Sequence, residues 1–209
     1  MKLSLLILLG YLIGSIPSGY IAGKIKGIDV TKEGFRKIGT SNIYRTLGFL
    51  PAVLVFFCDF MKSIIPIFIT GSLGFSEPLA SLSGFAAICG HNWPIWVGFK
   101  GGGRGAATSW GVLYYFMPCE TIILFVVFAG LSGIKKSSPL PMLIFFLLMP
   151  FGTRVFHEPL WMTGLTLGVF ALLLFTRVIG GIKAIRATEY KTKTILNLIL
   201  FDRESRNNK

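Results

Sequence analysis

Residues 90–111 read GHNWPIWVGFKGGGRGAATSWG, and apolar runs flank them on both sides. The stretch opens with His91, one of two histidines in the chain, and then carries three consecutive glycines, 101–103, between Lys100 and Arg104. A glycine run bracketed by cations exposes backbone N–H groups beside positive charge, which suits an anionic ligand such as phosphate. The alternative is a plain membrane loop whose cations only fix the orientation of the chain.

The composition around this loop is that of a polytopic membrane protein. Of the 209 residues 53% are hydrophobic and 14% charged, with a mean hydropathy of +0.69, which is too apolar for a soluble domain of this length. We expect one integral membrane domain over residues 1–209. The net charge of +12 lies in short loops between apolar runs, which indicates contact with a lipid bilayer and not with nucleic acid. The three cysteines are isolated and show no metal-ligand spacing, so we expect neither a metal nor a cofactor.

The apolar runs predict an all-α fold with seven membrane crossings, some of them short or broken. They cover residues 3–25, 48–74, 78–99, 106–117, 118–134, 139–151 and 160–176. Five crossings are the alternative, because several runs fall below the roughly 20 residues that span a bilayer. Pro17 predicts a kink in the first run, whose freed carbonyls need partners such as Ser15 or Ser18. Asp59 and Lys62, three residues apart in the second run, predict an intrahelical ion pair.

The distribution of positive charge predicts how the chain is oriented. With seven crossings and the N-terminus outside, the inner loops hold residues 24–45, Lys100 with Arg104, and Lys135 with Lys136. This asymmetry follows the positive-inside rule, so both candidate anion-binding motifs face the cytoplasm. Residues 177–209 form a basic cytoplasmic tail, which suits a helix on anionic lipid. The alternative for its one central acid, Glu189, is to orient a cation of the site.

The segment 39–45, GTSNIYR, is the second candidate motif. On a helix that starts here, Asn42 and Arg45 lie three apart on one face. Together with the hydroxyls of Thr40 and Ser41 they are the groups that hold an anion, although an N-cap followed by a membrane anchor uses the same residues. The chain shows no paired carboxylates and no Ser-His-Asp pattern. The residues therefore favour binding of phosphate-bearing substrates beside lipid, with transfer by positioning and charge stabilisation.

Four stretches together resemble the bacterial membrane acyl-phosphate:glycerol-3-phosphate acyltransferases. They are residues 14–20 with Lys24 and Asp29, residues 39–42 with 45–48, Asp59 with Lys62, and residues 90–94 with 98–108. The resemblance implies an inner-membrane enzyme of seven helices with its active site toward the cytoplasm. It also implies transfer of a fatty acyl group from acyl phosphate to the 1-hydroxyl of glycerol 3-phosphate, which forms lysophosphatidic acid and phosphate for phospholipid synthesis.

The resemblance also assigns roles within the site. The expected catalytic residues are His91, Lys100 and Arg104, and the expected substrate-binding residues are Thr40, Ser41, Asn42, Arg45, Gly101, Gly102 and Glu189. The cations are expected to hold the two phosphates and thereby stabilise charge on the leaving group. His91 is expected to orient the attacking hydroxyl or a phosphate and to take the proton of the hydroxyl.

The chain departs from the family pattern at three places. Phe35 stands where the family has a serine, Gly103 is an additional glycine, and Arg104 replaces a lysine. The C-terminal Arg-x-Asn and Gly-Thr-Glu motif is matched only by Arg177 and by residues 188–189. Two alternatives accompany the acyltransferase reading: a small transporter of phosphate or phosphate esters, whose site the broken spans suit, and a catalytically degenerate paralogue.

Overall fold

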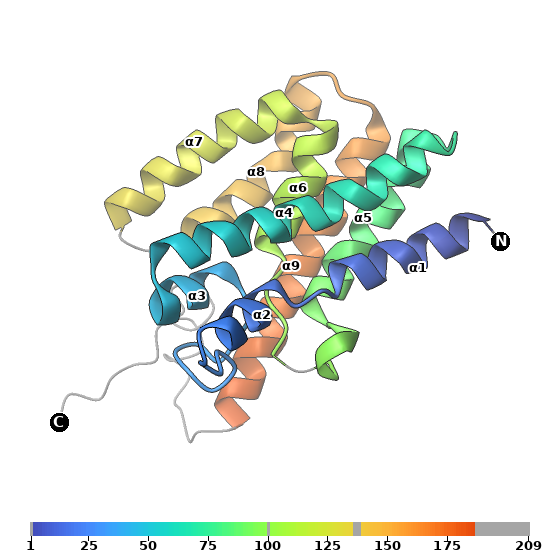
Figure 1. Cartoon of the computed structure of the whole chain (residues 1–209). Coiled ribbons are helices and arrows are strands. Elements are labelled where there is room, and N and C mark those ends of the chain that lie inside the picture. Colours follow the sequence, from blue (N-terminus) through green and yellow to red (C-terminus); the bar gives the residue numbers. More distant parts are fainter. Residues whose placement is uncertain (1, 100, 136–138, 187–209) are drawn as a thin grey trace. The chain divides into compact units, whose positions relative to one another are not determined.

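The computed structural model describes residues 2–99, 101–135 and 139–186, and over this part of the chain it is helical without strands (Figure 1). The chain divides into two compact units, Met1–Met117 and Pro118–Lys209, and each is described by itself. The all-α expectation is confirmed over the described residues. A single domain over residues 1–209 stays a prediction.

The first unit is built around one long helix, α4. Its elements are α1 (Lys2–Gly14), α2 (Ser18–Ile25), α3 (Thr40–Leu47), α4 (Phe49–Ser72), α5 (Glu77–Asn92), the short 3₁₀ turn η1 (Ile95–Val97) and α6 (Ala106–Phe116). Helix α4 packs against α1, α2, α3, α5 and α6 (Figure 1). It therefore fixes the positions of both segments that the sequence singled out, α3 with its preceding loop and the end of α5.

Helix α4 exposes apolar side chains and buries charged ones, which is the reverse of a helix on the surface of a soluble protein. Large side chains such as Phe57 and Phe68 are 60% and 61% exposed, whereas Asp59 and Lys62 are 1% and 5% exposed. In water such an apolar outer face would be costly, but in lipid it is the face that belongs outside. Three segments of the described chain are long and apolar enough to cross a membrane, namely Lys2–Ile25, Phe49–Ser72 and Leu160–Gly180.

The kink predicted at Pro17 is present as a break between α1 and α2. Ser15 Oγ donates to Tyr11 O at 2.8 Å, but that carbonyl also accepts from Ser15 N, so it is not one that Pro17 frees. The carbonyl of Ile16 has a partner that sequence reasoning did not supply, since Lys62 Nζ on α4 donates to it at 3.1 Å. The break is thus stabilised from a neighbouring helix, because a span in lipid has no water to satisfy a freed carbonyl.

Helices α1 and α5 approach each other directly through glycine. A Cβ atom at Gly10 or Gly14 would collide with the backbone of Ser83 or Ala87, and one at Gly90 would collide with the carbonyl of Tyr11. Small residues allow helix backbones in membranes to touch in this way. This contact places the C-terminal end of α5 beside the break between α1 and α2.

The second unit contains α7 (Pro118–Lys135), α8 (Pro139–Val155) and α9 (Leu160–Arg186). Helix α8 packs against both α7 and α9. Helix α9 covers the predicted apolar run 160–176 and continues without interruption through Arg177, whose side chain is 3% exposed. The first part of the predicted tail therefore belongs to a helix, while Glu189 lies outside the described residues.

Candidate active site

The glycine loop after η1 lies against the end of α5. Gly103 N donates to His91 O at 3.2 Å, and a Cβ atom at Gly103 would collide with Nε2 of the same histidine. A Cβ at Gly102 would likewise collide with the carbonyl of Asn92. Side chains at these two positions would collide with α5, so glycine is needed there for the loop to contact this helix.

The other side of the glycine loop contacts the segment that leads into α3. Ile38 N donates to Gly101 O at 3.0 Å, and a Cβ built at Gly39 would lie 3.8 Å from Gly103 Cα. The two motifs that the sequence singled out, 60 residues apart by number, therefore meet through their glycines. Lys100, expected to be catalytic, lies outside the described residues, and Arg104 is half-buried.

Helix α3 begins at Thr40, as the interpretation of a helical start at this motif predicted. Ser41 and Arg45 are exposed, and Thr40 is half-buried with an Oγ1 atom that has no hydrogen-bond partner among the described residues. The guanidinium Cζ of Arg45 lies 4.3 Å from the centroid of the Phe35 ring. Phe35, which replaces the family serine, thus stacks against Arg45, the cation expected to bind phosphate.

Asn42 has a structural role at the start of α3. Its Nδ2 donates to the carbonyls of Val30, Glu33 and Lys37, at 2.9, 3.2 and 2.7 Å, and its Oδ1 accepts from Phe35 N at 2.6 Å. The side chain is 2% exposed. These bonds wrap residues 30–37 around the amide, which makes Asn42 the anchor of this loop. A contact between Asn42 and substrate stays a prediction.

The loop that Asn42 anchors contains further local constraints. Arg36 has φ 54°, a left-handed conformation that favours glycine. At the start of the loop, Asp29 accepts from the hydroxyl and the backbone N–H of Thr31, at 2.6 and 3.1 Å. The hydroxyl bond lowers the pKa of the Asp29 carboxyl below its usual value. Asp29 therefore shapes the loop.

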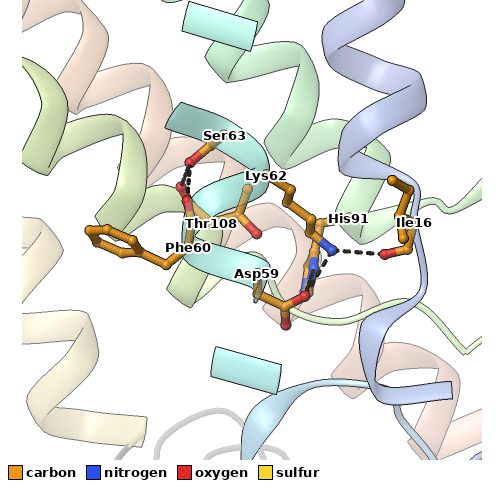
Figure 2. Close-up of polar contacts among 7 residues, drawn as sticks. All are labelled: Ile16, Asp59, Phe60, Lys62, Ser63, His91 and Thr108. Carbon is orange, nitrogen blue, oxygen red and sulfur yellow. Dashed lines mark hydrogen bonds and ion pairs between the residues drawn. The ribbon is translucent and has the colours of Figure 1, made fainter. Parts of the chain in front are cut away.

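A buried ion pair lies behind the glycine loop. The predicted intrahelical pair of Asp59 and Lys62 is confirmed with an N···O distance of 2.8 Å. His91 Nδ1 lies 3.6 Å from the same Asp59 oxygen, and Figure 2 shows both contacts together with the bond from Lys62 to Ile16. Sequence reasoning predicted the pair from its i, i+3 spacing but missed His91 as its neighbour, because α4 and α5 meet only in the folded chain.

The end of α5 and the first turn of α6 add a set of buried polar atoms without hydrogen bonds among the described residues. They are Thr108 Oγ1, Ser109 Oγ and both amide atoms of Asn92. Gly105, which precedes α6, has φ 71°, and a Cβ there would lie 2.8 Å from Asn92 Oδ1. A helix N-terminus with open polar groups and nearby cations is suited to an anion. Sequence reasoning missed Asn92, although it directly follows His91.

The described residues contain no group of three or more His, Cys, Asp or Glu that could hold a metal ion. The residues gathered around the glycine loop include hydroxyls at the starts of α3 and α6, and Arg45 and Arg104 are cations close to them in the sequence. These groups bind and neutralise oxyanions, so the arrangement suits the transfer of a group carried by phosphate.

The fold is that of a helical membrane protein, and the comparisons with known proteins agree with that class. The family model described as glycerol-3-phosphate acyltransferase matches residues 4–188. The chain therefore belongs to the glycerol-3-phosphate acyltransferase family, which confirms the resemblance found in its motifs.

Individual relatives match over much of their length. The glycerol-3-phosphate acyltransferase of Geobacter sulfurreducens is 33% identical over 185 residues, which cover 88% of this chain and 94% of the relative. That of Trichlorobacter lovleyi is 37% identical over 145 residues, covering 65% and 74%. The crystal structure of PlsY (YgiH), an integral membrane glycerol 3-phosphate acyltransferase, in its glycerol 3-phosphate form is similar with a TM-score of 0.79 and 29% identity, covering 95% of this chain and 99% of that one.

Proposed function

We propose that this chain transfers a fatty acyl group from acyl phosphate to the 1-hydroxyl of glycerol 3-phosphate in phospholipid synthesis. The observation that carries the proposal is the meeting of the glycine loop, His91 and the start of α3 in one site. Relatives of this chain are named glycerol-3-phosphate acyltransferase, and the second solved form of PlsY is its lysophosphatidic acid form. That form is similar to this chain with a TM-score of 0.78.

The proposed reaction needs no covalent enzyme intermediate. The 1-hydroxyl oxygen attacks the acyl carbonyl carbon, the bond from that carbon to the phosphate oxygen breaks, and the hydroxyl proton ends on the released phosphate. Arg45, Lys100 and Arg104 hold the two phosphates and stabilise the charge that grows on the leaving group. His91 orients the hydroxyl or relays its proton.

The remaining expected residues complete the substrate contacts. Thr40 and Ser41 hydrogen-bond substrate oxygens, and Asn42 acts through the loop that its amide holds. Gly101 and Gly102 present backbone N–H groups, and Glu189 orients a cation. The buried hydroxyl of Thr40, which has no hydrogen-bond partner in the described part of the chain, supports this assignment, because such an atom is costly unless a ligand supplies a partner. Residues that hold the two substrates in a reactive geometry lower the barrier of the transfer step.

We further propose seven crossings within one domain of the bacterial inner membrane. The break between α1 and α2 lies within one span, and α4 to α9 supply the others. The N-terminus lies outside, and the C-terminus and the site face the cytoplasm. The concentration of cations in residues 24–45 and in the glycine loop supports this orientation.

Purified protein in lipid, supplied with acyl phosphate and glycerol 3-phosphate, tests the proposal. We expect lysophosphatidic acid and phosphate to appear in equal amounts, and neither product to form without glycerol 3-phosphate. Acyl-CoA in place of acyl phosphate is expected to give no product. Phosphate release at the background rate with both substrates present would overturn the proposal, and uptake of labelled glycerol 3-phosphate by sealed vesicles without acylation would favour a transporter.

A further inference from the structure

Two charged groups lie buried on α4. Asp59 and Lys62 are 1% and 5% exposed and pair at 2.8 Å. Taking charges out of water costs about several kcal/mol per ion, and a well-packed apolar pair in the same space is often as stable. Stability alone therefore gives little reason for this pair, and its contacts with neighbouring elements point to another role.

One side of the pair faces His91 on α5. The Nδ1 atom of His91 lies 3.6 Å from Asp59 Oδ1 and has no hydrogen-bond partner among the described residues. The opposite edge of the ring faces the glycine loop so closely that a Cβ at Gly103 would collide with Nε2. The imidazole is thus wedged between a carboxylate and a loop backbone, and its orientation affects where that backbone can lie.

The other side of the pair is held at the break in the first span. Lys62 Nζ donates to Ile16 O at 3.1 Å while it pairs with Asp59 (Figure 2). The ammonium group is buried, so its contacts are with these two groups and not with solvent. Lys62 therefore balances the charge of Asp59 and fixes the carboxylate in front of His91.

We propose that Asp59 is a positioning residue for the glycine loop: its carboxylate, 3.6 Å from Nδ1 of His91, keeps the ring proton on that nitrogen and so holds Nε2 toward Gly103. The inference rests on the proposed function, in which this loop and its Arg104 bind phosphate. A carboxylate at Nδ1 selects one tautomer of a histidine and one orientation of its ring. A change at Asp59 then reaches the loop through His91, without Asp59 touching substrate.

Nitrogen-15 NMR of the full chain labelled at histidine tests the first link of this proposal without an activity assay. The chain has two histidines, so His91→Ala assigns the His91 signals and His157 remains as a reference. We expect Nδ1 of His91 to carry a proton in the wild-type protein. A neutral ring protonated at Nε2 instead overturns the proposal, because Asp59 would then not keep the proton on Nδ1.

A charge-balanced double variant, Asp59→Asn with Lys62→Met, tests the second link. Both residues are replaced because a single change would leave one buried charge unpaired. We expect the His91 signals to shift and kcat/KM for glycerol 3-phosphate to fall about 100-fold, as it does when substrate-holding groups move by ~1 Å. In a His91→Ala background the same double change should cause no further loss, since the link is already broken.

Thr70→Val is the matched control. Thr70 is buried on the same helix and bonds Pro66 O and Ser83 Oγ, so its loss removes a polar contact between α4 and α5 far from His91. We expect the Thr70→Val variant to have the kcat/KM of the wild-type protein and unchanged His91 signals. Wild-type kcat/KM in the folded double variant of Asp59 and Lys62 overturns the proposal. So does a further fall in kcat/KM when the double change is added to His91→Ala. Absence of acyl transfer by the wild-type protein would defeat the proposed function instead, and the NMR result would still decide this inference.

Discussion

Phe35, which stands where the family pattern has a serine, stacks against the guanidinium group of Arg45. The guanidinium lies 4.3 Å from the ring centroid, and Arg45 is exposed, so the contact is worth about 0.5–1 kcal/mol. We predict that Phe35→Leu raises the KM for glycerol 3-phosphate about two- to fivefold by freeing the guanidinium. Phe35→Tyr, which keeps the ring, should leave the KM unchanged. An equal rise in both variants, measured by steady-state kinetics, would contradict the role of the ring.

Gly103 is the second residue at which this chain departs from the family pattern, and its backbone lies against His91. A Cβ atom there would collide with Nε2, and the ring cannot retreat freely because Asp59 lies on its other side. We predict that Gly103→Ala lowers kcat/KM about 100-fold by displacing the loop. Gly71→Ala on α4 is the control, since a Cβ there would lie at an ordinary 3.9 Å from Tyr115 Oη. Equal activity of the two variants would refute the prediction.

The loop before α3 depends on one amide, that of Asn42. Asn42→Ala leaves three backbone carbonyls without this donor, and we predict a loss of about 1–3 kcal/mol in the stability of the loop. The loop contains trypsin sites at Lys32, Arg36 and Lys37, so its opening is measurable as cleavage there. We expect faster cleavage in Asn42→Ala than in Ser41→Ala, whose side chain is exposed. Identical cleavage rates would show that the amide does not hold the loop.

At the level of elements, the sequence predicts what is local and misses what is brought together by packing. Hydrophobic runs predicted the helices, Pro17 predicted the break, and the spacing of Asp59 and Lys62 predicted their pair. The Ile16 carbonyl as a partner of Lys62 could not be predicted, because it depends on how α4 packs against the first span. The sequence suggested a surface helix after residue 176, but not that α9 continues into it without interruption, because hydropathy falls there.

The same limit applies to the site. The glycine run and its cations predicted an anion loop by composition, since backbone exposure and charge follow from residue type. Which glycine faces which side chain follows only from the fold, as Gly102 against Asn92 and Gly103 against His91 show. Asn42 illustrates the converse: its residue type suggested a substrate contact, while the structure uses all of its amide for the loop.

For the whole molecule, α4 sets the membrane orientation that can be tested. Its 24 residues rise about 36 Å at ~1.5 Å each, enough to cross a hydrocarbon core of ~30 Å. Lys32, before this helix, and Glu77, after it, are both exposed. In a variant lacking the three native cysteines, we predict that Glu77→Cys reacts with a membrane-impermeant maleimide in intact spheroplasts, whereas Lys32→Cys reacts only after lysis. Labelling of Lys32→Cys from outside would reverse the proposed orientation and place the loop before α3 on the outer side.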